Sequence, residues 1–368
     1  PLPPVHQEEL AHIGAGLRFT ESPTQYLSEL RERHGDTYLV DVFGFKLLMT
    51  YSPKGLESLY KYEEDEASFA MATFDMIGFK TPIEILVDTD SKLFYHLLMH
   101  KKMPAYVSTI SNAVEQVLSE WPSEQNIDIF DSIRTLEQRV GFSLWLAKEA
   151  SDNEYWPELK RCFDALDQEQ SFVNPQSTLE TIKTDKAKER AAVGRLYKLI
   201  PQIIHKHNEN DDKEYATIDF FHEHFSQQNS DITEDALEKR IIHNVMNANQ
   251  GFLSNLYAGI AWVIVRLIEH PDVLNRVKDE IAAVKNQHGK NFTENVEALN
   301  QLCYLEQVTM ESIRMAQRSL TLRKVMKPIE FNDGNTVYQV EPGIYITTRL
   351  SFTNTPTEKL KQINPDNY

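Results

Sequence analysis

The chain has 368 residues and a formal net charge of −17, from 55 acidic and 38 basic side chains. Because such a surface repels phosphate groups, the composition argues against a nucleic-acid-binding protein and against attraction to anionic lipid. Hydrophobic residues make up 41% of the chain and aromatic residues 10%, which is enough for a large packed core and excludes a disordered chain.

Two cysteines, Cys162 and Cys303, stand far apart, so the sequence has neither a disulfide framework nor a zinc-binding spacing. Each is predicted to be a small buried hydrophobic residue. No window has the roughly 18–20 apolar residues of a membrane span, and no signal peptide is evident. The proline-rich residues 1–5 are predicted to be a stiff, extended segment, or what remains where a membrane anchor has been trimmed.

The N-terminal residues predict two helices separated by a β-hairpin. Ser22 can cap the first helix, Pro23 suits its first turn and Gly35 ends it. Gly44 splits two strand-like runs into a hairpin. The acidic residues 63–66 are predicted to be a solvated turn. The predicted ranges are a helix over Ser22–His34, strands over Thr37–Val42 and Phe45–Thr50, and a helix over Pro53–Tyr60.

The middle of the chain has the spacing of apolar residues that is typical of helices. Ser91 to about Ser151 is predicted to be helical, and the same period returns from Ala187 to His205. Residues 175–185 are predicted to be a loop or the start of a helix, and residues 208–213 a surface loop.

The longest predicted helix runs unbroken from Ala236 to His270. Thr233 is its expected cap, acidic residues follow at the positive end of its dipole, and Pro271 stops it. Its length far exceeds the average of about 11–12 residues, and its apolar residues lie on more than one side. It is therefore predicted to be buried through the middle of a large domain.

The C-terminal third predicts two further helices followed by a small sheet. The ranges are helices over Pro271–Gln287 and Leu302–Gln317, and strands over Lys327–Phe331, Val337–Val340 and Ile344–Thr348. Because there is no internal repeat and no clear linker, residues 1–368 are predicted to form a single domain, mainly α-helical with small β-sheets.

Most common catalytic motifs are absent from the sequence. His222 and His224 would lie about 200° apart on a helix, so they cannot easily share a metal ion. Glu311 and Arg314 are more informative, because residues three apart lie on one helical face and can form an ion pair. Such a pair is usually a solvated surface contact. Here its helix is strongly apolar, the long helix precedes it and a small sheet follows.

This order of elements resembles the cytochrome P-450 superfamily over nearly the whole chain. Residues 236–271 resemble the family's long central helix over the haem, and Glu311-x-x-Arg314 matches its Glu-x-x-Arg pair. In the family this pair braces the segment before the haem loop. Arg323 stands where the family often has a basic residue that bonds a haem propionate. The resemblance therefore implies haem as the cofactor.

Two of the family's haem-binding features do not match residues of the sequence. The cysteine ligand of the iron is expected beyond residue 368, because Cys162 and Cys303 are in the wrong places to replace it. An axial thiolate promotes O–O bond cleavage, so this chemistry is expected only of a protein that continues past Tyr368. The usual Trp-x-x-x-Arg propionate clamp is also missing. Its predicted substitutes are His96, His100 and Lys101.

The central helix lacks the family's usual acid–threonine pair, which supplies protons during oxygen activation. Phe252 stands at the acid position and Leu253 at the alcohol position. Gly251 would allow a close approach to the haem, and neutral hydrogen-bonding side chains surround it. The predicted catalytic residues are Asn249, Gln250, Gly251 and Asn255.

This stretch is similar to prostacyclin synthase and allene oxide synthase, which rearrange lipid peroxides without O2 or a reductase. Sterol-hydroxylating relatives also deviate at this helix, so both mechanisms stay open. In the structural alternative, the amide side chains only satisfy one another in a kinked helix.

Three functions follow from the resemblance. The first is O2-dependent hydroxylation of a small lipophilic substrate, sterol or fatty-acid derived, with a reductase or ferredoxin as redox partner. The second is a reductase-independent lipid-peroxide isomerase or dehydratase. The third is a non-catalytic, haem-free relative that binds a lipid or a protein. The expected location is the cytoplasm or the face of the endoplasmic-reticulum membrane, reached in the latter case through an N-terminal anchor.

Overall fold

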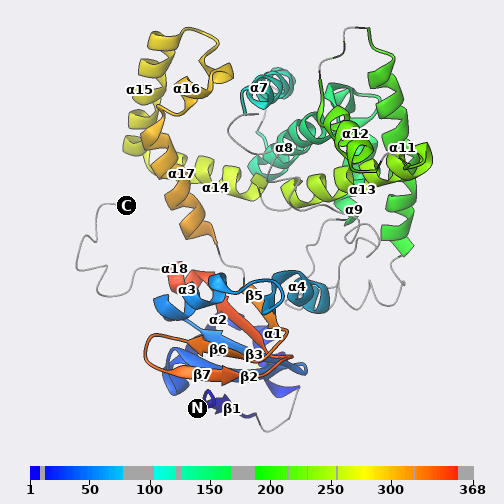
Figure 1. Ribbon diagram of the computed structural model, residues 1–368. Helices are drawn as coiled ribbons and strands as arrows, with labels where there is room; N and C mark the ends of the chain where they lie inside the picture. Colours follow the sequence, from blue (N-terminus) through cyan, green and yellow to red (C-terminus); the bar gives the residue numbers. More distant parts are fainter. Residues whose placement is uncertain are drawn as a thin grey trace. The chain divides into compact units, whose positions relative to one another are not determined.

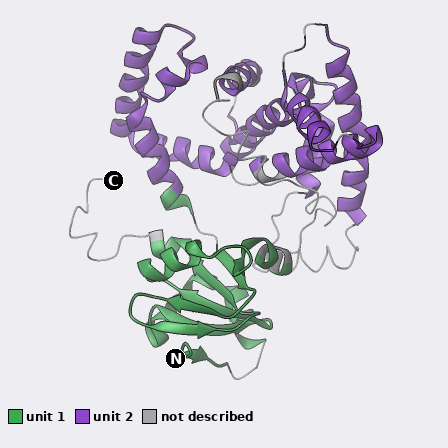
Figure 2. Ribbon diagram, in the orientation of Figure 1, with its two compact units in different colours: residues 1–79, 169–183, 314–368 green, residues 80–168, 184–313 purple. Residues whose placement is uncertain are grey.

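The computed structural model is mainly helical with two small β-sheets, which confirms the predicted fold class (Figure 1). The chain divides into two compact units (Figure 2). Unit 1 contains residues 1–79, 169–183 and 314–368, and unit 2 contains residues 80–168 and 184–313. The single domain over residues 1–368 stays a prediction. The structure describes residues 1–8, 13–77, 103–121, 126–166, 187–211, 213, 215–229, 231–253, 256–317 and 320–354.

A six-stranded mixed sheet forms the centre of unit 1. In spatial order its strands are β1 (Val5–His6), β2 (Thr37–Val42), β3 (Phe45–Thr50), β8 (Tyr345–Arg349), β5 (Leu320–Val325) and β4 (Ala67–Ser68). β1 pairs with β2 and β3 with β8 in parallel, whereas the other pairs are antiparallel. A separate two-stranded ribbon joins β6 (Ile329–Asn332) to β7 (Val337–Val340).

The β2–β3 hairpin has the predicted bounds, because its turn residues and its pattern of buried side chains both specify the same strand pairing. Phe43 and Gly44 both have positive φ, 54° and 88°, which a tight hairpin turn requires. The Gly44 amide donates to Asp41 Oδ1 at 2.7 Å. Val40 and Leu47, paired across the two strands, are both buried in the core of unit 1.

Three other strands show where the sequence signal was weak. β6 begins two residues later than predicted, after Pro328, which has no amide hydrogen for a strand ladder. β8 begins and ends one residue later than predicted. β5 was not predicted, because Arg323 and Lys324 interrupt its alternation of apolar residues.

In the described part of unit 1, the helices that flank the strands are α1 (Gly14–Glu21), α2 (Pro23–His34), α3 (Pro53–Lys61), α4 (Phe69–Ile77) and α18 (Leu350–Asn354). α2 begins at Pro23, one residue after the predicted Ser22, whose side chain makes no capping hydrogen bond. It ends before Gly35, whose φ of 86° is available to glycine at little cost. α1 was not predicted. Its Phe19 is 1% exposed and packs with Tyr26 and Leu27 of α2 in the same core.

Ser52 fixes α3 to the β6–β7 ribbon. Its Oγ accepts a hydrogen bond from the Gly55 amide at 2.9 Å and donates to the Asp333 carbonyl at 2.6 Å. A side chain at Gly55 would collide with Thr50 Oγ1, 2.1 Å from an ideal Cβ position. This corner therefore needs a capping hydroxyl and a glycine three residues apart.

Unit 2 is helical throughout its described part. Its elements are α7 (Met103–Ser119), α8 (Ile129–Trp145), η1 (Lys148–Ser151), α9 (Trp156–Leu166), α11 (Ala187–Asn208), α12 (Thr217–Gln228), α13 (Glu234–Leu253), α14 (Leu256–Glu269), α15 (Pro271–His288), η2 (Phe292–Glu294), α16 (Val296–Leu299) and most of α17 (Cys303–Ala316). α8 packs against α7, α13 and α14, so it runs through the core of the unit (Figure 1).

The helices predicted over Ala187–His205, Pro271–Gln287 and Leu302–Gln317 are confirmed within a few residues. The stretch predicted to be helical from Ser91 to about Ser151 is interrupted, because residues 120–121 and 126–128 are not helical and separate α7 from α8. α11 extends three residues beyond the predicted His205, and α15 one residue beyond Gln287. Residues 234–253 and 256–269 are helical, and Thr233 Oγ1 accepts from the Ala236 amide as predicted. Whether the long helix is continuous depends on residues 254–255, which lie outside the described residues. Residues 91–102, at the start of the predicted 91–151 stretch, also lie outside them.

Within the described ranges, no helix combines the length and the apolar character needed to cross a membrane.

Candidate functional site

Asn249 is the predicted catalytic residue whose side chain the structure describes. It lies on α13, is completely buried, and its Nδ2 donates to the Val245 carbonyl one turn earlier at 2.9 Å. Its Oδ1 accepts no hydrogen bond from any described residue. A buried carbonyl oxygen without a donor costs about 1–3 kcal/mol, so Oδ1 is placed to receive a donor from water, a ligand or an undescribed residue.

The other predicted catalytic residues are only partly described. Gly251 lies within α13, whereas the side chain of Gln250 is outside the described residues. Asn255 is outside them entirely. Their proximity to one another and to a substrate therefore stays a prediction.

Phe252, at the acid position of the resemblance, is half-buried and packs into the core of unit 2. Its ring meets Trp145 of α8 edge-to-face, with ring centroids 6.1 Å apart. An aromatic contact of this kind favours packing and supplies no proton donor. The structure therefore gives this side chain a packing role.

Glu311 and Arg314 lie one turn apart on α17, and both are half-buried. The beginning of this helix is fixed by Glu280 of α15, whose Oε1 and Oε2 accept from the Tyr304 and Leu305 amides at 2.7 and 2.9 Å. A carboxylate at a helix N-terminus satisfies orphan amides and matches the dipole. Glu280 was not found from the sequence, because no local spacing joins it to the start of α17.

Arg276 reinforces this junction between α15 and α17. Its guanidinium carbon lies 4.0 Å from the centre of the Tyr304 ring, a cation–π arrangement. Together with Glu280 it holds the helix that carries Glu311 at its N-terminal end.

Arg323 of β5 is tied to the segment between α3 and β4. Its Nη1 donates to the Tyr62 and Ala67 carbonyls at 3.0 and 2.9 Å and lies 3.3 Å from Glu64 Oε1. The side chain is 17% exposed. Residues 64–66 form the predicted turn, so that turn also supplies partners for an arginine far along the chain. The contact with a propionate stays a prediction, and among the described residues Arg323 Nε and Nη2 make no hydrogen bond.

Asp75 of α4 joins two neighbouring strands of the same sheet. Its Oδ2 accepts from Lys324 Nζ of β5 at 2.5 Å and from the Tyr345 hydroxyl of β8 at 2.8 Å. Burial, and then the hydrogen bond to Asp75, raise the pKa of Tyr345 well above its ordinary value of 10. Tyr345 therefore stays a neutral donor at physiological pH. This cluster could not be found from the sequence, because its members are far apart in the chain.

The two cysteines do not fit the role of a thiolate ligand for haem iron. Cys162 is 1% exposed inside α9, and burial raises its pKa to about 11, whereas metal binding needs the thiolate. Cys303 is exposed at the start of α17, which corrects the prediction that both cysteines are buried. Its position at a loop-to-helix junction explains the exposure. His96, His100 and Lys101 lie outside the described residues.

Comparisons with known proteins extend these observations. A family model described as Cytochrome P450 matches residues 3–355. The 24-hydroxycholesterol 7-alpha-hydroxylase of Homo sapiens is 19% identical over 346 residues, covering 89% of this chain and 69% of that protein. The 7-alpha-hydroxycholest-4-en-3-one 12-alpha-hydroxylase of Oryctolagus cuniculus is 20% identical over 355 residues, covering 89% of the chain and 66% of the relative. The chain thus spans about two thirds of the length of these relatives.

A solved structure described as retinoic acid bound cyanobacterial CYP120A1 matches with a TM-score of 0.67 and 16% identity. The match covers 100% of this chain and 80% of the other. At this identity, the likeness shows a shared fold.

Proposed function

The chain belongs to the cytochrome P450 family, and from this we propose that it is a haem-thiolate monooxygenase that hydroxylates a small lipophilic substrate with O2. The family match over residues 3–355 carries the proposal. The names of two relatives, both hydroxylases of sterol-derived compounds, support a substrate of sterol or fatty-acid origin.

Haem, the cofactor that the family implies, would supply oxygen activation at its iron. Because neither Cys162 nor Cys303 fits as the axial ligand, the proposal places that ligand beyond residue 368. Nη1 of Arg323 is occupied by Tyr62, Glu64 and Ala67. The other two guanidinium nitrogens would bind the haem propionates. His96, His100 and Lys101 are the further proposed contacts.

The proposed role of α13 and the residues after it is to hydrogen-bond the substrate or water near the haem. Asn249 Oδ1 is a buried acceptor that can orient a substrate hydroxyl or a water molecule. The amides of Gln250 and Asn255 would act similarly, and Gly251 would leave room for close approach. None of these groups is acidic, so protons would reach the site through oriented water. Glu311 and Arg314 would brace the pocket through α17.

The test is the absorption spectrum of the full-length protein, reduced and exposed to carbon monoxide. A thiolate-ligated haem gives its characteristic shifted Soret band, and the proposal expects this band with about one haem per chain. A Cys162→Ala variant is the matched control and should give the same spectrum. A full-length protein that takes up no haem would support the haem-free relative and contradict the proposal.

A peroxide isomerase or dehydratase is the second candidate, and Phe252 favours it. This side chain stands at the acid position, has no ionisable group and packs on Trp145. The discriminating assay supplies a fatty-acid hydroperoxide without a reductant. Turnover under these conditions supports the isomerase, whereas strict dependence on NAD(P)H and a redox partner supports the hydroxylase.

A hydroxylase would also need an electron donor. A reductase or a ferredoxin is the proposed redox partner, and the endoplasmic-reticulum membrane face or the cytoplasm the proposed location. Reconstitution with each donor in turn would separate these partners by the rate of product formation.

A further inference from the structure

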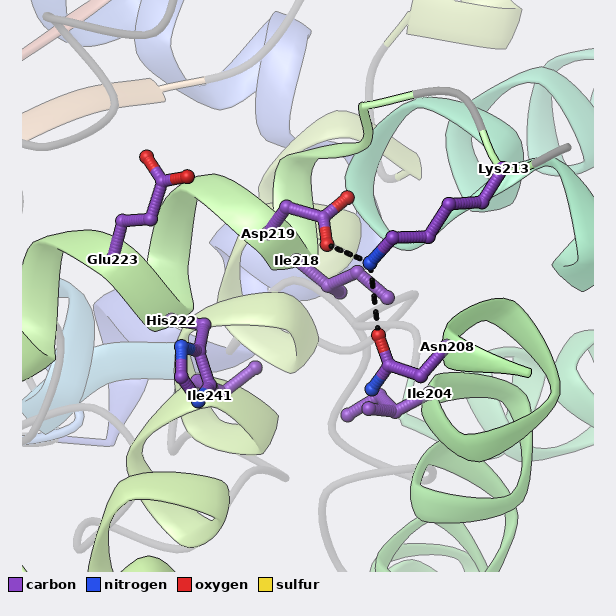
Figure 3. A pocket seen from close by; sticks show the side chains of 8 residues that line it. All are labelled: Ile204, Asn208, Lys213, Ile218, Asp219, His222, Glu223 and Ile241. Atoms are coloured by element: carbon purple, nitrogen blue, oxygen red, sulfur yellow. Dashed lines mark hydrogen bonds and ion pairs between the residues drawn. The ribbon is translucent and has the colours of Figure 1, made fainter. Parts of the chain in front are cut away.

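A cavity of about 240 Å³ in unit 2 involves none of the residues assigned above (Figure 3). It lies where the end of α11, the first half of α12 and α13 meet. Its floor is apolar and consists of Ile204, Ile218 and Ile241. Its polar lining consists of Asn208, Lys213, Asp219, His222 and Glu223.

The Asp219 carboxylate in the cavity lining already has hydrogen-bond partners. Asp219 Oδ2 is bonded to His207 Nε2 at 2.9 Å and accepts from the Ala216 amide at 2.8 Å. Its Oδ1 accepts from Lys213 Nζ at 3.1 Å. Burial alone would raise the pKa of Asp219, but these hydrogen bonds outweigh it and lower the pKa. Asp219 is therefore an ionised, compensated group with little capacity left for a further cation.

The groups that remain available at the cavity are donors. Lys213 Nζ has three N–H bonds and donates to Asp219 Oδ1 and to Asn208 Oδ1, the latter at 3.2 Å. Asn208, Lys213 and His222 are exposed at the mouth of the cavity, and Asn208 Nδ2 and the ring of His222 have no hydrogen-bond partner among the described residues. Figure 3 shows Lys213 and Asn208 on one side and His222 on the other, with the isoleucines between them.

Glu223, the remaining acidic residue of the lining, is directed away from the other lining side chains (Figure 3). Its Oε2 accepts from the Tyr215 hydroxyl at 3.0 Å. The cavity thus combines unused donors, one of them cationic, with an apolar floor.

We propose that this cavity binds a small aliphatic carboxylate. The carboxylate accepts charge-assisted hydrogen bonds from Lys213, together with Asn208 and His222, while its chain packs on the three isoleucines. The volume equals that of about eight water molecules at roughly 30 Å³ each, which suits a branched acid of five or six carbons.

The test uses the full chain with its isoleucine δ1 methyl groups labelled for NMR and 4-methylpentanoate as the probe. The methyl signals of Ile204, Ile218 and Ile241 should shift saturably, and those of isoleucines elsewhere should not. Lys213→Met should weaken binding at least tenfold, and His222→Leu severalfold. Lys206→Met is the matched control, because Lys206 pairs with Asp152 and Glu154 outside the cavity, and binding should be unchanged.

The neutral isostere 4-methylpentanamide separates charge recognition from simple filling of the cavity. It should bind at least tenfold more weakly than the acid. The proposal is overturned if the three methyl signals do not move, if the amide binds as tightly as the acid, or if Lys213→Met binds as the parent does. The unperturbed methyl signals of each variant report that it is folded. The experiment does not involve haem, so its outcome is independent of the proposed function.

Discussion

Each unit contains a histidine that joins elements far apart in the chain, but the two histidines have opposite kinds of partner. In unit 2, His207 is 1% exposed, and its Nδ1 and Nε2 lie 3.0 and 2.9 Å from Glu149 Oε2 and Asp219 Oδ2. In unit 1, Nε2 of His34 lies 3.0 Å from Nδ1 of His6. His6 Nε2 in turn lies 3.0 Å from Glu8 Oε1.

These partners set the hydrogen bonds that each ring can make. His207 places one ring nitrogen beside each of two carboxylates. Burial acts to raise the pKa of Glu149, but hydrogen bonds from Asn210, its backbone and His207 lower it overall. Between His6 and His34, by contrast, one proton must be shared. Burial, then the charges of His6 and Arg33, lower the pKa of His34 and favour its neutral form.

The same residue type therefore bridges two carboxylates in unit 2 and contacts a second imidazole in unit 1. His207 links α11 to η1 and α12, with one ring nitrogen beside each carboxylate. His34 links the edge strand β1 to the end of α2, and its lowered pKa means that protonation of this ring disfavours the folded unit. Removing the His207 contacts should therefore lower stability strongly, whereas the His6–His34 contact should depend on pH.

Replacing His207 by leucine should have the largest effect. It leaves Glu149 and Asp219 without the histidine that both carboxylates contact, and removing one partner of such a buried group typically costs about 3–5 kcal/mol. Urea denaturation followed by circular dichroism should show this loss. His205→Leu, on the same helix but with a 74% exposed side chain, should stay within about 0.5 kcal/mol of the parent. A loss below about 1 kcal/mol for His207→Leu would mean that the two carboxylates do not depend on this histidine.

Clusters of this kind mark the limit of what the sequence predicts. The β2–β3 hairpin, α2 and α15 could be predicted, because caps, glycines and period are local signals. The family was predicted from the spacing of Glu311 and Arg314 in its context and is confirmed. His207 meets Glu149 across 58 residues, and Arg323 meets Tyr62 across 261, so no spacing reveals these contacts. β5 was missed because Arg323 and Lys324 interrupt its alternation of apolar residues, and the partners that accommodate these charges lie far along the chain.

The candidate site was predicted less well than the fold. Asn249 was chosen as a hydrogen-bonding residue, and the structure adds that its Oδ1 is buried without a described donor. Glu280 and Asp75, which position α17 and the β5–β8 pair, could not be found, because each acts through residues on another element. The roles of Gln250, Asn255, Glu311, Arg314 and Arg323 stay predictions.

Replacing Tyr26 by phenylalanine should have an intermediate effect and tests the surroundings of the His6–His34 pair. The Tyr26 hydroxyl donates to Glu8 Oε1 at 2.9 Å, the same oxygen that His6 contacts. Losing one such hydrogen bond should cost about 1 kcal/mol, because the ring itself stays packed in the core. Urea denaturation measures the change, and Tyr60→Phe, at an exposed tyrosine, is the control. Equal stability of the Tyr26→Phe variant would show that Glu8 is held without this hydroxyl.

The smallest expected effect is a difference in pH dependence between the two units. Because the pKa of His34 is lowered on folding, this group contributes to the stability of unit 1 at a pH above its ordinary pKa of 6.5. That contribution is lost as the pH falls through the lowered pKa. The lowered pKa values of Glu149 and Asp219 keep their contribution to unit 2 until the pH falls below their ordinary values of 4.5 and 3.8.

Hydrogen exchange can follow both units in one sample. The Leu39 amide, which donates to the Pro4 carbonyl at 2.7 Å, reports the attachment of β1, and the Ile218 amide, which donates to the Leu146 carbonyl, reports that of α12. Between pH 6.5 and 4.5, corrected protection at Leu39 should fall while that at Ile218 holds. His34→Gln should flatten the dependence at Leu39, because an amide side chain does not titrate there. If both amides lost protection together, or if His34→Gln changed nothing, the pair of histidines would not be the titrating contact.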